Sequence, residues 1–307
     1  MTTTAVAWRE QTLTMPDLDL AWFEAGDGPT VVFLHGGPGL DHRLLRPLAT
    51  PLTGRYRCVL PDQRGSGRSR LDRLDGTTLH VDRFLADIEA LRTQLGEERL
   101  RLVGWSWGAF LALLYGAVHP ERVERLALIA PGPVEYELIE VYRANLVRPL
   151  TAAERRARAD LVARGEAALE AGDREGYRAL HRELMALTFR VWFYDPDLAE
   201  RHLESYLASA GDPYDGALVG RHVLGSLGEF GAWERIGTWD APTLVLYGYQ
   251  DFEPITQAYQ FREWIPQARL AFLNECGHFP WLEQPEAFYH ELGALLGDEQ
   301  GREERPS

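Results

Sequence analysis

The sequence predicts an α/β protein in which a mainly parallel sheet, flanked by helices, carries an inserted helical cap. Short apolar segments alternate with helical patterns through residues 1–132 and again through 238–297, which together predict the core domain. Most of these segments are apolar throughout, as expected for strands that helices cover on both faces. The intervening residues 133–237 contain no convincing strand and predict the cap, and residues 298–307 form a polar C-terminal tail.

Seven segments have the length and apolar composition of buried strands. They are residues 20–24, 30–34, 56–60, 100–103, 125–129, 243–247 and 269–273. An antiparallel entry into the sheet is expected around the Met15-Pro16-Asp17 turn. The remaining strands are separated by helical patterns, which is the arrangement of repeated βα units.

Helices are predicted both within the core and within the cap. Apolar residues recur at helical spacing over residues 81–95, and residues 107–118 form a second helix whose small residues allow close packing on the sheet. In the cap, Thr151 and Glu154 have the spacing of a capping box. Asp195-Pro196 has the pattern of an N-cap followed by a proline at the first helical position.

Composition excludes several classes of function. The formal net charge of −14 disfavours binding to nucleic acids or anionic lipids. All 32 Lys+Arg positions are arginine, which excludes lysine Schiff bases and the phosphate-binding lysine of a P-loop. The two cysteines, Cys58 and Cys276, lack the number and spacing of a disulfide framework or zinc site, and are expected to be small buried residues.

Hydrophobic patterning indicates neither a membrane span nor a secretory signal. No apolar run approaches the roughly 20 residues that a bilayer span requires. The first residues show no basic segment followed by an apolar one. We therefore expect a cytoplasmic protein that has neither membrane nor nucleic-acid partners.

The segment Gly104-Trp105-Ser106-Trp107-Gly108 joins a predicted strand to a predicted helix. Glycines at both ends relieve the crowding of a sharp strand-to-helix turn. Ser106 is then expected at the tip of the turn, near a helix N-terminus whose N–H groups can stabilise a developing oxyanion. This context favours Ser106 as a catalytic nucleophile over a residue of an ordinary tight turn.

A nucleophilic serine needs a histidine base that is itself oriented by a carboxylate. His278 follows a predicted strand and precedes a helix start at Pro285, so it lies in a strand-end loop, where functional residues concentrate. Asp251 lies in the loop after the preceding strand and is the predicted acid. Glu253 and Asp240 compete for that role, although each also fits a solvated or helix-capping charge.

The segment His35-Gly36-Gly37-Pro38-Gly39 follows the strand predicted over residues 30–34. Its three glycines let backbone N–H groups come close to a reacting carbonyl, which is the role of an oxyanion hole. We assign one donor to the N–H of Gly37 and the other to the N–H of Trp107, directly after the nucleophile. His35 itself is expected to make a structural hydrogen bond.

With these motifs the chain resembles the α/β-hydrolases. The His35–Gly39 motif, together with Asp62-Gln63-Arg64-Gly65-Ser66-Gly67-Arg68-Ser69, resembles the proline iminopeptidase (prolyl aminopeptidase) family. The resemblance covers residues 30–132 and 242–296. It implies an α/β-hydrolase fold and a metal-free serine peptidase that removes an N-terminal residue, often proline.

Chain order and the second motif fit this resemblance. Ser106, Asp251 and His278 follow one another in the order that the fold requires of a nucleophile, acid and base. The second motif follows a predicted strand and is expected to buttress the active-site loops through Asp62 and Arg64.

Two features depart from the aminopeptidase pattern. Trp105 precedes the predicted nucleophile, whereas these aminopeptidases usually have glycine at that position. Several carboxylesterases of this fold have tryptophan there. We therefore expect Trp105 to shape the substrate pocket and to contact the substrate. The family also holds the substrate's amino group with cap carboxylates, and the sequence contexts of those carboxylates have no match in the predicted cap of this chain. Candidates by position are Glu183, Glu204, Glu229 and Glu234. Glu204 is our choice because the neighbouring Leu203 and Leu207 suggest partial burial; the alternative is a surface ion pair with Arg201.

Three functions remain open. The first is an aminopeptidase of the proline iminopeptidase type, which acts on small peptides. The second is a carboxylesterase, amidase or lactonase that acts on small substrates without a free amine. The third is a binding protein that has lost catalysis, which the intact Ser106, Asp251, His278 and glycine loop disfavour. No cofactor is expected, and no metal, because the remaining histidines lack the spacing of metal ligands.

Overall fold

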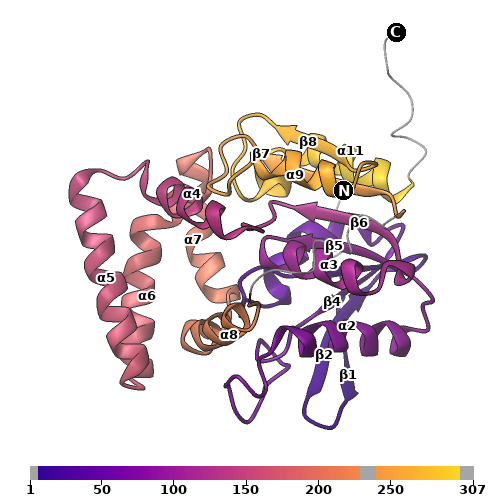
Figure 1. The fold of residues 1–307 in the computed structure, drawn as a ribbon, viewed down its shortest axis with the longest axis horizontal. Helices are drawn as coiled ribbons and strands as arrows, with labels where there is room; N and C mark the ends of the chain where they lie inside the picture. Colours follow the sequence, from indigo (N-terminus) through magenta and orange to yellow (C-terminus); the bar gives the residue numbers. More distant parts are fainter. Residues whose placement is uncertain (1–5, 229–239, 298–307) are drawn as a thin grey trace.

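An eight-stranded sheet, in the order β1-β2-β4-β3-β5-β6-β7-β8, runs through the computed structural model, which describes residues 6–228 and 240–297 (Figure 1). The strands are β1 Arg9–Thr14, β2 Asp19–Ala25, β3 Thr30–Leu34, β4 Arg57–Pro61, β5 Leu100–Trp105, β6 Val123–Ile129, β7 Thr243–Gly248 and β8 Arg269–Leu273. β2 pairs antiparallel with both β1 and β4, and the later neighbours pair in parallel. The chain therefore has the predicted α/β-hydrolase architecture.

The strand predictions are confirmed, with ends that differ by no more than two residues. The antiparallel entry is also present: the Met15 N–H donates to the Leu18 carbonyl at 2.8 Å, which closes the turn between β1 and β2. β1 was not among the predicted strands because its residues alternate little and are mostly exposed. An edge strand that buries so little has no apolar pattern for the sequence to show.

Helices cover both faces of the sheet. The helices of the described residues are α1 Arg46–Ala49, α2 Val81–Leu95, α3 Trp107–Val118, α4 Tyr136–Val147, α5 Ala152–Glu170, α6 Arg174–Thr188, α7 Pro196–Ser209, α8 Pro213–Gly225, α9 Gln257–Trp264, α10 Pro280–Glu283 and α11 Pro285–Leu296. On one face of the sheet lie α2, α3 and α9, and on the other α1 and α11. Short 3₁₀ turns lie at η1 His42–Leu45, η2 Thr50–Leu52, η3 Pro120–Arg122 and η4 Phe189–Trp192. The helices predicted over residues 81–95 and 107–118 coincide with α2 and α3.

Two hydrophobic clusters lie on opposite faces of the sheet, and the alternation within β3 shows how they form. Val32 and Leu34 point into the cluster that includes α2, α3 and α9, whereas Val31 and Phe33 point into the one that includes α1 and α11. Successive side chains of a strand point to opposite faces, so a strand covered on both sides is apolar at every position. That is the composition from which the strands were predicted.

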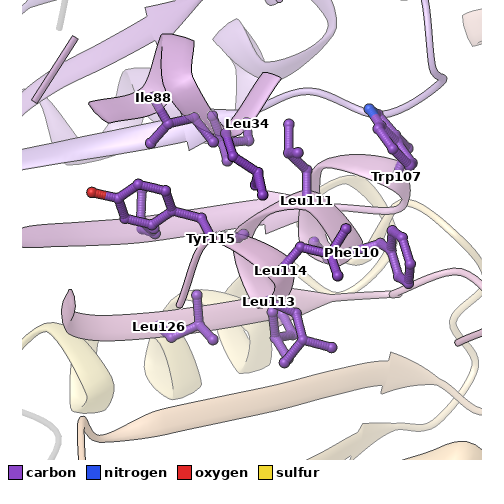
Figure 2. Packing of buried hydrophobic residues seen from close by; sticks show 14 of the residues in the cluster. Leu34, Ile88, Trp107, Phe110, Leu111, Leu113, Leu114, Tyr115 and Leu126 are labelled. Carbon is purple, nitrogen blue, oxygen red and sulfur yellow. The ribbon is translucent and has the colours of Figure 1, made fainter. Parts of the chain in front are cut away.

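The helix α3 packs tightly between the sheet and α2. Figure 2 shows Leu111 and Tyr115 of this helix near Leu34 of β3 and Ile88 of α2, and Phe110 beside Trp107. The Tyr115 hydroxyl donates to the Glu89 carboxylate at 2.7 Å, which satisfies its polar atom at the edge of this cluster. Burial on nearly all sides holds the N-terminus of α3 firmly in place, and that N-terminus lies at the candidate site.

The helices α4–α8 lie to one side of the sheet, where α5 and α6 form a long adjacent pair (Figure 1). No strand occurs between β6 and β7 in the described part of this region. The capping box is present, with the Thr151 hydroxyl accepting from the Glu154 N–H at 3.3 Å, and Asp195 caps α7 ahead of Pro196. The division into core, cap and tail remains a prediction, and residues 229–239 lie outside the described ranges.

Candidate active site

Ser106 is the single residue between β5 and α3. Its backbone has φ 55° and ψ −121°, a conformation that costs a non-glycine residue on the order of 1–3 kcal/mol. Two hydrogen bonds hold the turn: the Ser106 N–H donates to the Ile129 carbonyl at 2.9 Å, and the Ala109 N–H donates to the Ser106 carbonyl at 3.0 Å. The strained backbone places the hydroxyl at the tip of the turn, on the wall of a cavity.

The two flanking glycines are required by close contacts. A Cβ at Gly104 would collide with the carbonyl oxygen of Gly108, and a Cβ at Gly108 would collide with the carbonyl oxygen of Leu34 in β3. Both obstacles are backbone atoms, which cannot move aside as a flexible side chain can. The predicted reason for the glycines is therefore confirmed: they allow α3 to turn back against the sheet.

Asp251 and His278 form a buried hydrogen-bonded pair. The Nδ1 of His278 lies 3.0 Å from Oδ1 and 3.1 Å from Oδ2 of Asp251. The two side chains, of His278 and Asp251, are 2% and 0% exposed respectively. Oδ1 of Asp251 also accepts the Glu253 N–H at 3.0 Å, which fixes the carboxylate. This arrangement keeps the proton on Nδ1 and leaves Nε2 of His278 as an acceptor.

Contacts from the core and the cap hold the His278 loop. The His278 N–H donates to the carbonyl of Trp192 in η4 at 2.7 Å, and Nε1 of Trp105 donates to the His278 carbonyl at 2.9 Å. The rings of Trp105 and Phe252 lie 5.1 and 4.5 Å from the imidazole. Trp105, predicted to contact substrate, is 1% exposed, lines the cavity and supports the His278 loop through its hydrogen bond to the His278 carbonyl.

A cavity of about 780 Å³ lies between the strand ends and the cap helices. Ser106, His278 and Gly37 line it from the core. Aromatic and aliphatic residues line it from the cap, among them Tyr142, Met185, Trp192 and Tyr206. No hydrogen bond joins the Ser106 hydroxyl to His278 in the described structure, and such bonds are often long until substrate binds. The cavity has the size of a small-molecule site.

The glycine loop, residues 35–39, lies beside the turn that holds Ser106. Gly37 has φ +123° and lines the cavity, and a Cβ at Gly36 would lie 2.8 Å from the Trp105 ring. Trp107 is the first residue of α3, where backbone N–H groups have no acceptor within the helix. The two predicted oxyanion donors, Gly37 and Trp107, therefore border the same cavity as Ser106.

Gln63 connects these parts, and the sequence analysis missed it. Its N–H donates to Nε2 of His35 at 3.0 Å, its side-chain amide donates to the His35 carbonyl at 2.7 Å, and its Oε1 accepts from Nε1 of Trp107 at 2.8 Å. Nδ1 of His35 lies 2.9 Å from the Gly36 carbonyl, and burial lowers the pKa of this histidine. The expected structural role of His35 agrees with these contacts. The position of Gln63 inside a recognised motif was the available signal.

Asp62 and Arg64 act at different places. Asp62 accepts from the N–H and Nδ1 of His42, at 2.9 and 2.7 Å, and from the Arg68 N–H at 2.8 Å, so it buttresses the loop after β3 as expected. Arg64 instead binds Asp87 of α2 through two hydrogen bonds of 2.7 and 2.6 Å. The expectation that Arg64 braces the active-site loops is therefore wrong, because its long side chain points toward α2.

One cluster in the described residues, Asp41, His42 and Asp62, brings three possible metal ligands together. Its oxygens already serve the protein: Asp62 accepts the three N–H groups described above, and Asp41 pairs with Arg43 at 2.6 Å. The cluster therefore acts as a loop brace. Cys58 and Cys276 are both buried and free, and no helix in the described ranges is long and apolar enough to cross a membrane.

Glu204 is not where its prediction placed it. Its side chain is 77% exposed, pairs with Arg182 at 3.2 Å and does not line the cavity. The expected burial is wrong, because α7 turns this residue outward, and the ion pair reaches α6 rather than Arg201. Glu183 and Asp240 are also exposed, whereas Glu229 and Glu234 lie outside the described residues.

Known proteins show the family to which these parts belong. Residues 29–285 match the family described as the alpha/beta hydrolase fold. The chain belongs to this family. Among relatives, this α/β-hydrolase is 29% identical over 299 residues to a proline iminopeptidase from Xanthomonas citri, covering 88% of this chain and 91% of that protein.

Solved structures give the same architecture. A proline iminopeptidase-related protein from Thermus thermophilus is 25% identical, with a TM-score of 0.71 over 95% of this chain and 98% of that one. A hydrolase of the α/β fold family from Bacillus anthracis strain Sterne has a TM-score of 0.73 over 95% of this chain and 100% of that one. Its 20% identity shows the fold alone. Family and relatives together support hydrolase activity.

Proposed function

We propose that this α/β-hydrolase is a serine hydrolase in which Ser106 is the nucleophile, His278 the general base and Asp251 the acid that orients it. The buried Asp251–His278 pair, on the same cavity as a serine in a strained strand-to-helix turn, carries the proposal. Solvated loop charges would have neither the burial nor the two close N···O contacts of this pair. A few polar groups that are buried and held by hydrogen bonds in an apolar cleft are characteristic of functional sites.

The chemistry follows from the geometry. Nε2 of His278 takes the proton of the Ser106 hydroxyl as Oγ attacks the substrate carbonyl, and Asp251 stabilises the imidazolium that forms. The N–H groups of Gly37 and Trp107 stabilise the oxyanion of the tetrahedral intermediate. His278 then gives the proton to the leaving group, which departs and leaves an acyl-enzyme. Water hydrolyses this ester by the same steps in reverse, and no cofactor or metal takes part.

The proposed substrate is a small peptide from which the enzyme releases an N-terminal residue. Two observations support this choice: the paired motifs at residues 35–39 and 62–69, and the similarity to a proline iminopeptidase over most of both chains. A cavity of about 780 Å³ accommodates a short peptide but not a folded protein. Because cap helices close the cavity on one side, it suits a peptide whose N-terminal residue lies next to Ser106.

An esterase, amidase or lactonase is the second candidate. The apolar rings that line the cap side of the cavity, Tyr142, Trp192 and Tyr206 among them, favour an uncharged acyl group, and Trp105 before the nucleophile is shared with carboxylesterases of this fold. Such an enzyme would use the same triad but would not require a free amine. The two candidates therefore differ in the substrate rather than in the catalytic residues.

A two-part experiment tests the proposal. An active-site-directed fluorophosphonate should label Ser106 in the folded protein; an unlabelled Ser106 would indicate a binding protein that has lost catalysis. Steady-state kinetics should then compare prolyl and alanyl anilides, their N-acetylated forms and short-chain nitrophenyl esters. Cleavage of the free-amine anilides with refusal of the acetylated ones supports the aminopeptidase, and equal rates on both would leave the esterase or amidase.

A further inference from the structure

A second buried carboxyl group, that of Glu253, lies on the wall of the active-site cavity. The residue is 3% exposed and lines the cavity together with Ser106 and His278. Its N–H donates to Asp251 at 3.0 Å, a bond that fixes the loop without using the Glu253 side chain. Oε2 of Glu253 is buried and has no hydrogen-bond partner among the described residues.

Two polar side chains near this carboxyl group, those of Tyr247 and Gln257, form hydrogen bonds with other partners. The Tyr247 hydroxyl donates to the Pro131 carbonyl at 3.0 Å and accepts from Nε2 of Gln257 at 2.7 Å. The Oε1 of Gln257 accepts the Val134 N–H at 3.1 Å. These hydrogen bonds of Tyr247 and Gln257 form without Glu253. Its unpartnered carboxyl oxygen lies on the cavity wall, which Tyr142 also lines, and is left to interact with a ligand.

Leaving an ionised carboxylate buried and unpaired is unfavourable, because it loses its hydration and gains no partner. Burial first, and then the charge of the adjacent Asp251, raises the pKa of Glu253 well above its ordinary value. Both effects favour the protonated form of Glu253, which avoids that cost. A glutamine or an apolar residue would fill a purely structural position without this penalty, so the acid itself points to a ligand.

The cavity wall also selects the charge of that ligand. Among its described residues Glu253 is the one carboxylic acid. The lining arginine, Arg143, is 67% exposed and pairs with Glu140 at 2.7 Å, so its charge is turned to solvent. The described cavity wall therefore offers a cation one acidic group, that of Glu253, because Asp251 does not line the cavity and is already bound to His278.

We propose that Glu253 binds the protonated amino group of the substrate and thereby makes the enzyme require a free N-terminus. The inference rests on the proposed aminopeptidase function and assigns to a core loop the task that the sequence analysis gave to Glu204 in the cap. An ammonium group supplies the missing partner of Oε2 and allows Glu253 to ionise. A neutral acetamide cannot do so, because it brings no positive charge to balance the carboxylate.

The test compares Glu253→Gln with Glu204→Gln, which removes the same charge from an exposed cap position. In Glu253→Gln the KM for prolyl anilide should rise about 10- to 100-fold, the loss expected for a charged hydrogen bond. The same substitution at Glu204 should leave KM within about twofold. Fluorophosphonate labelling of Ser106, which needs the triad but no amine, should proceed in Glu253→Gln within about threefold of the wild-type rate.

The outcomes separate this inference from the proposed function. If the wild-type enzyme cleaves free and acetylated anilides equally, the aminopeptidase proposal is wrong. If the wild-type enzyme requires the free amine and Glu253→Gln still requires it with an unchanged KM, the proposed function stands and the assignment of Glu253 fails. Slower fluorophosphonate labelling together with an equal loss on all substrates would mean that Glu253 only positions Asp251, which also overturns the assignment.

Discussion

The core and cap walls of the active-site cavity are built in different ways. On the core side, the Asp251 and His278 side chains are almost fully buried and joined by hydrogen bonds of 3.0 and 3.1 Å. On the outer surface of the cap, away from the cavity, the charged groups Glu204 and Arg182 pair with each other at 77% and 61% exposure, where an ion pair stabilises a protein little. The difference teaches that the polar chemistry comes from the core, while the cap supplies apolar walls.

Backbone geometry explains the contrast. Parallel strands end at one edge of the sheet, so the loops after β3, β5, β7 and β8 all reach the same cavity. The cap helices line the cavity with side chains that also pack on the core, such as that of Tyr206. Substitutions on the core wall should therefore have large effects, and substitutions of cap charges small ones.

The largest effect is expected for Ser106→Ala. Removing the nucleophile should lower kcat by roughly 10⁴- to 10⁶-fold, because no other hydroxyl stands at the tip of the turn. Steady-state kinetics on the best anilide or ester would measure it, with circular dichroism to verify folding. Near wild-type turnover would exclude Ser106 as the nucleophile.

Asp251→Asn should lower kcat by roughly 10³- to 10⁴-fold, because the imidazole loses control of its tautomer and the imidazolium loses its partner. The comparison with Glu253→Gln is the control, since the two acids lie in the same loop. If Asp251→Asn retained near wild-type kcat while Glu253→Gln did not, Glu253 rather than Asp251 would be the acid of the triad.

Alanine substitutions at two glycines, one in the core and one in the cap, test the comparison through the free energy of unfolding. Gly108→Ala places a methyl group against the Leu34 carbonyl and should lower the free energy of unfolding by at least about 3 kcal/mol. Gly220→Ala, within the cap helix α8, meets nothing within 4 Å and should raise it by about 0.5–1 kcal/mol. Urea denaturation measures both, and equal effects would contradict the contrast between a packed core turn and an open cap helix.

The pH dependence of stability should reveal the raised pKa of Glu253. Its pKa is raised in the folded protein, so the folded state holds a proton that the unfolded chain releases above about pH 4.5. The wild-type protein therefore loses stability as pH rises above that value, and Glu253→Gln removes this loss. The stability of the variant relative to wild type should increase between pH 5 and pH 7, by at most about 1.4 kcal/mol per pH unit. A constant difference, measured by urea denaturation at each pH, would show that Glu253 is ionised in the folded protein.

The smallest effect is expected for Glu204→Gln. The exposed pair with Arg182 should contribute less than about 1 kcal/mol to stability, and kcat/KM should change by less than about twofold. Thermal unfolding and anilide kinetics measure the two quantities. A large rise in KM for free-amine substrates would return the amine-binding role to the cap.

The sequence by itself determined the features that depend on local patterns. Strand composition and helical spacing predicted the sheet and its flanking helices, because burial on two faces leaves an apolar run. The glycines around Ser106 predicted a sharp turn, because only glycine tolerates the contacts that Gly104 and Gly108 make. Asp251 and His278 were predicted as catalytic candidates because each lies in a loop that follows a strand. The structure places their side chains within hydrogen-bonding distance. Their catalytic roles remain our proposal.

The tertiary structure alone decided the features that depend on burial and on distant partners. Apolar neighbours along a helix suggested burial for Glu204, yet the direction of the whole helix turns it to solvent. Glu253 looked like a solvated loop charge, yet the loops after β6 and β7 enclose it. The roles of Gln63 and Trp192 follow from hydrogen bonds to residues far along the chain, His35 and His278, which only the folded structure shows. Local spacing specifies which element a residue joins, whereas its exposure and its hydrogen bonds are set by elements that the chain brings together only when it folds.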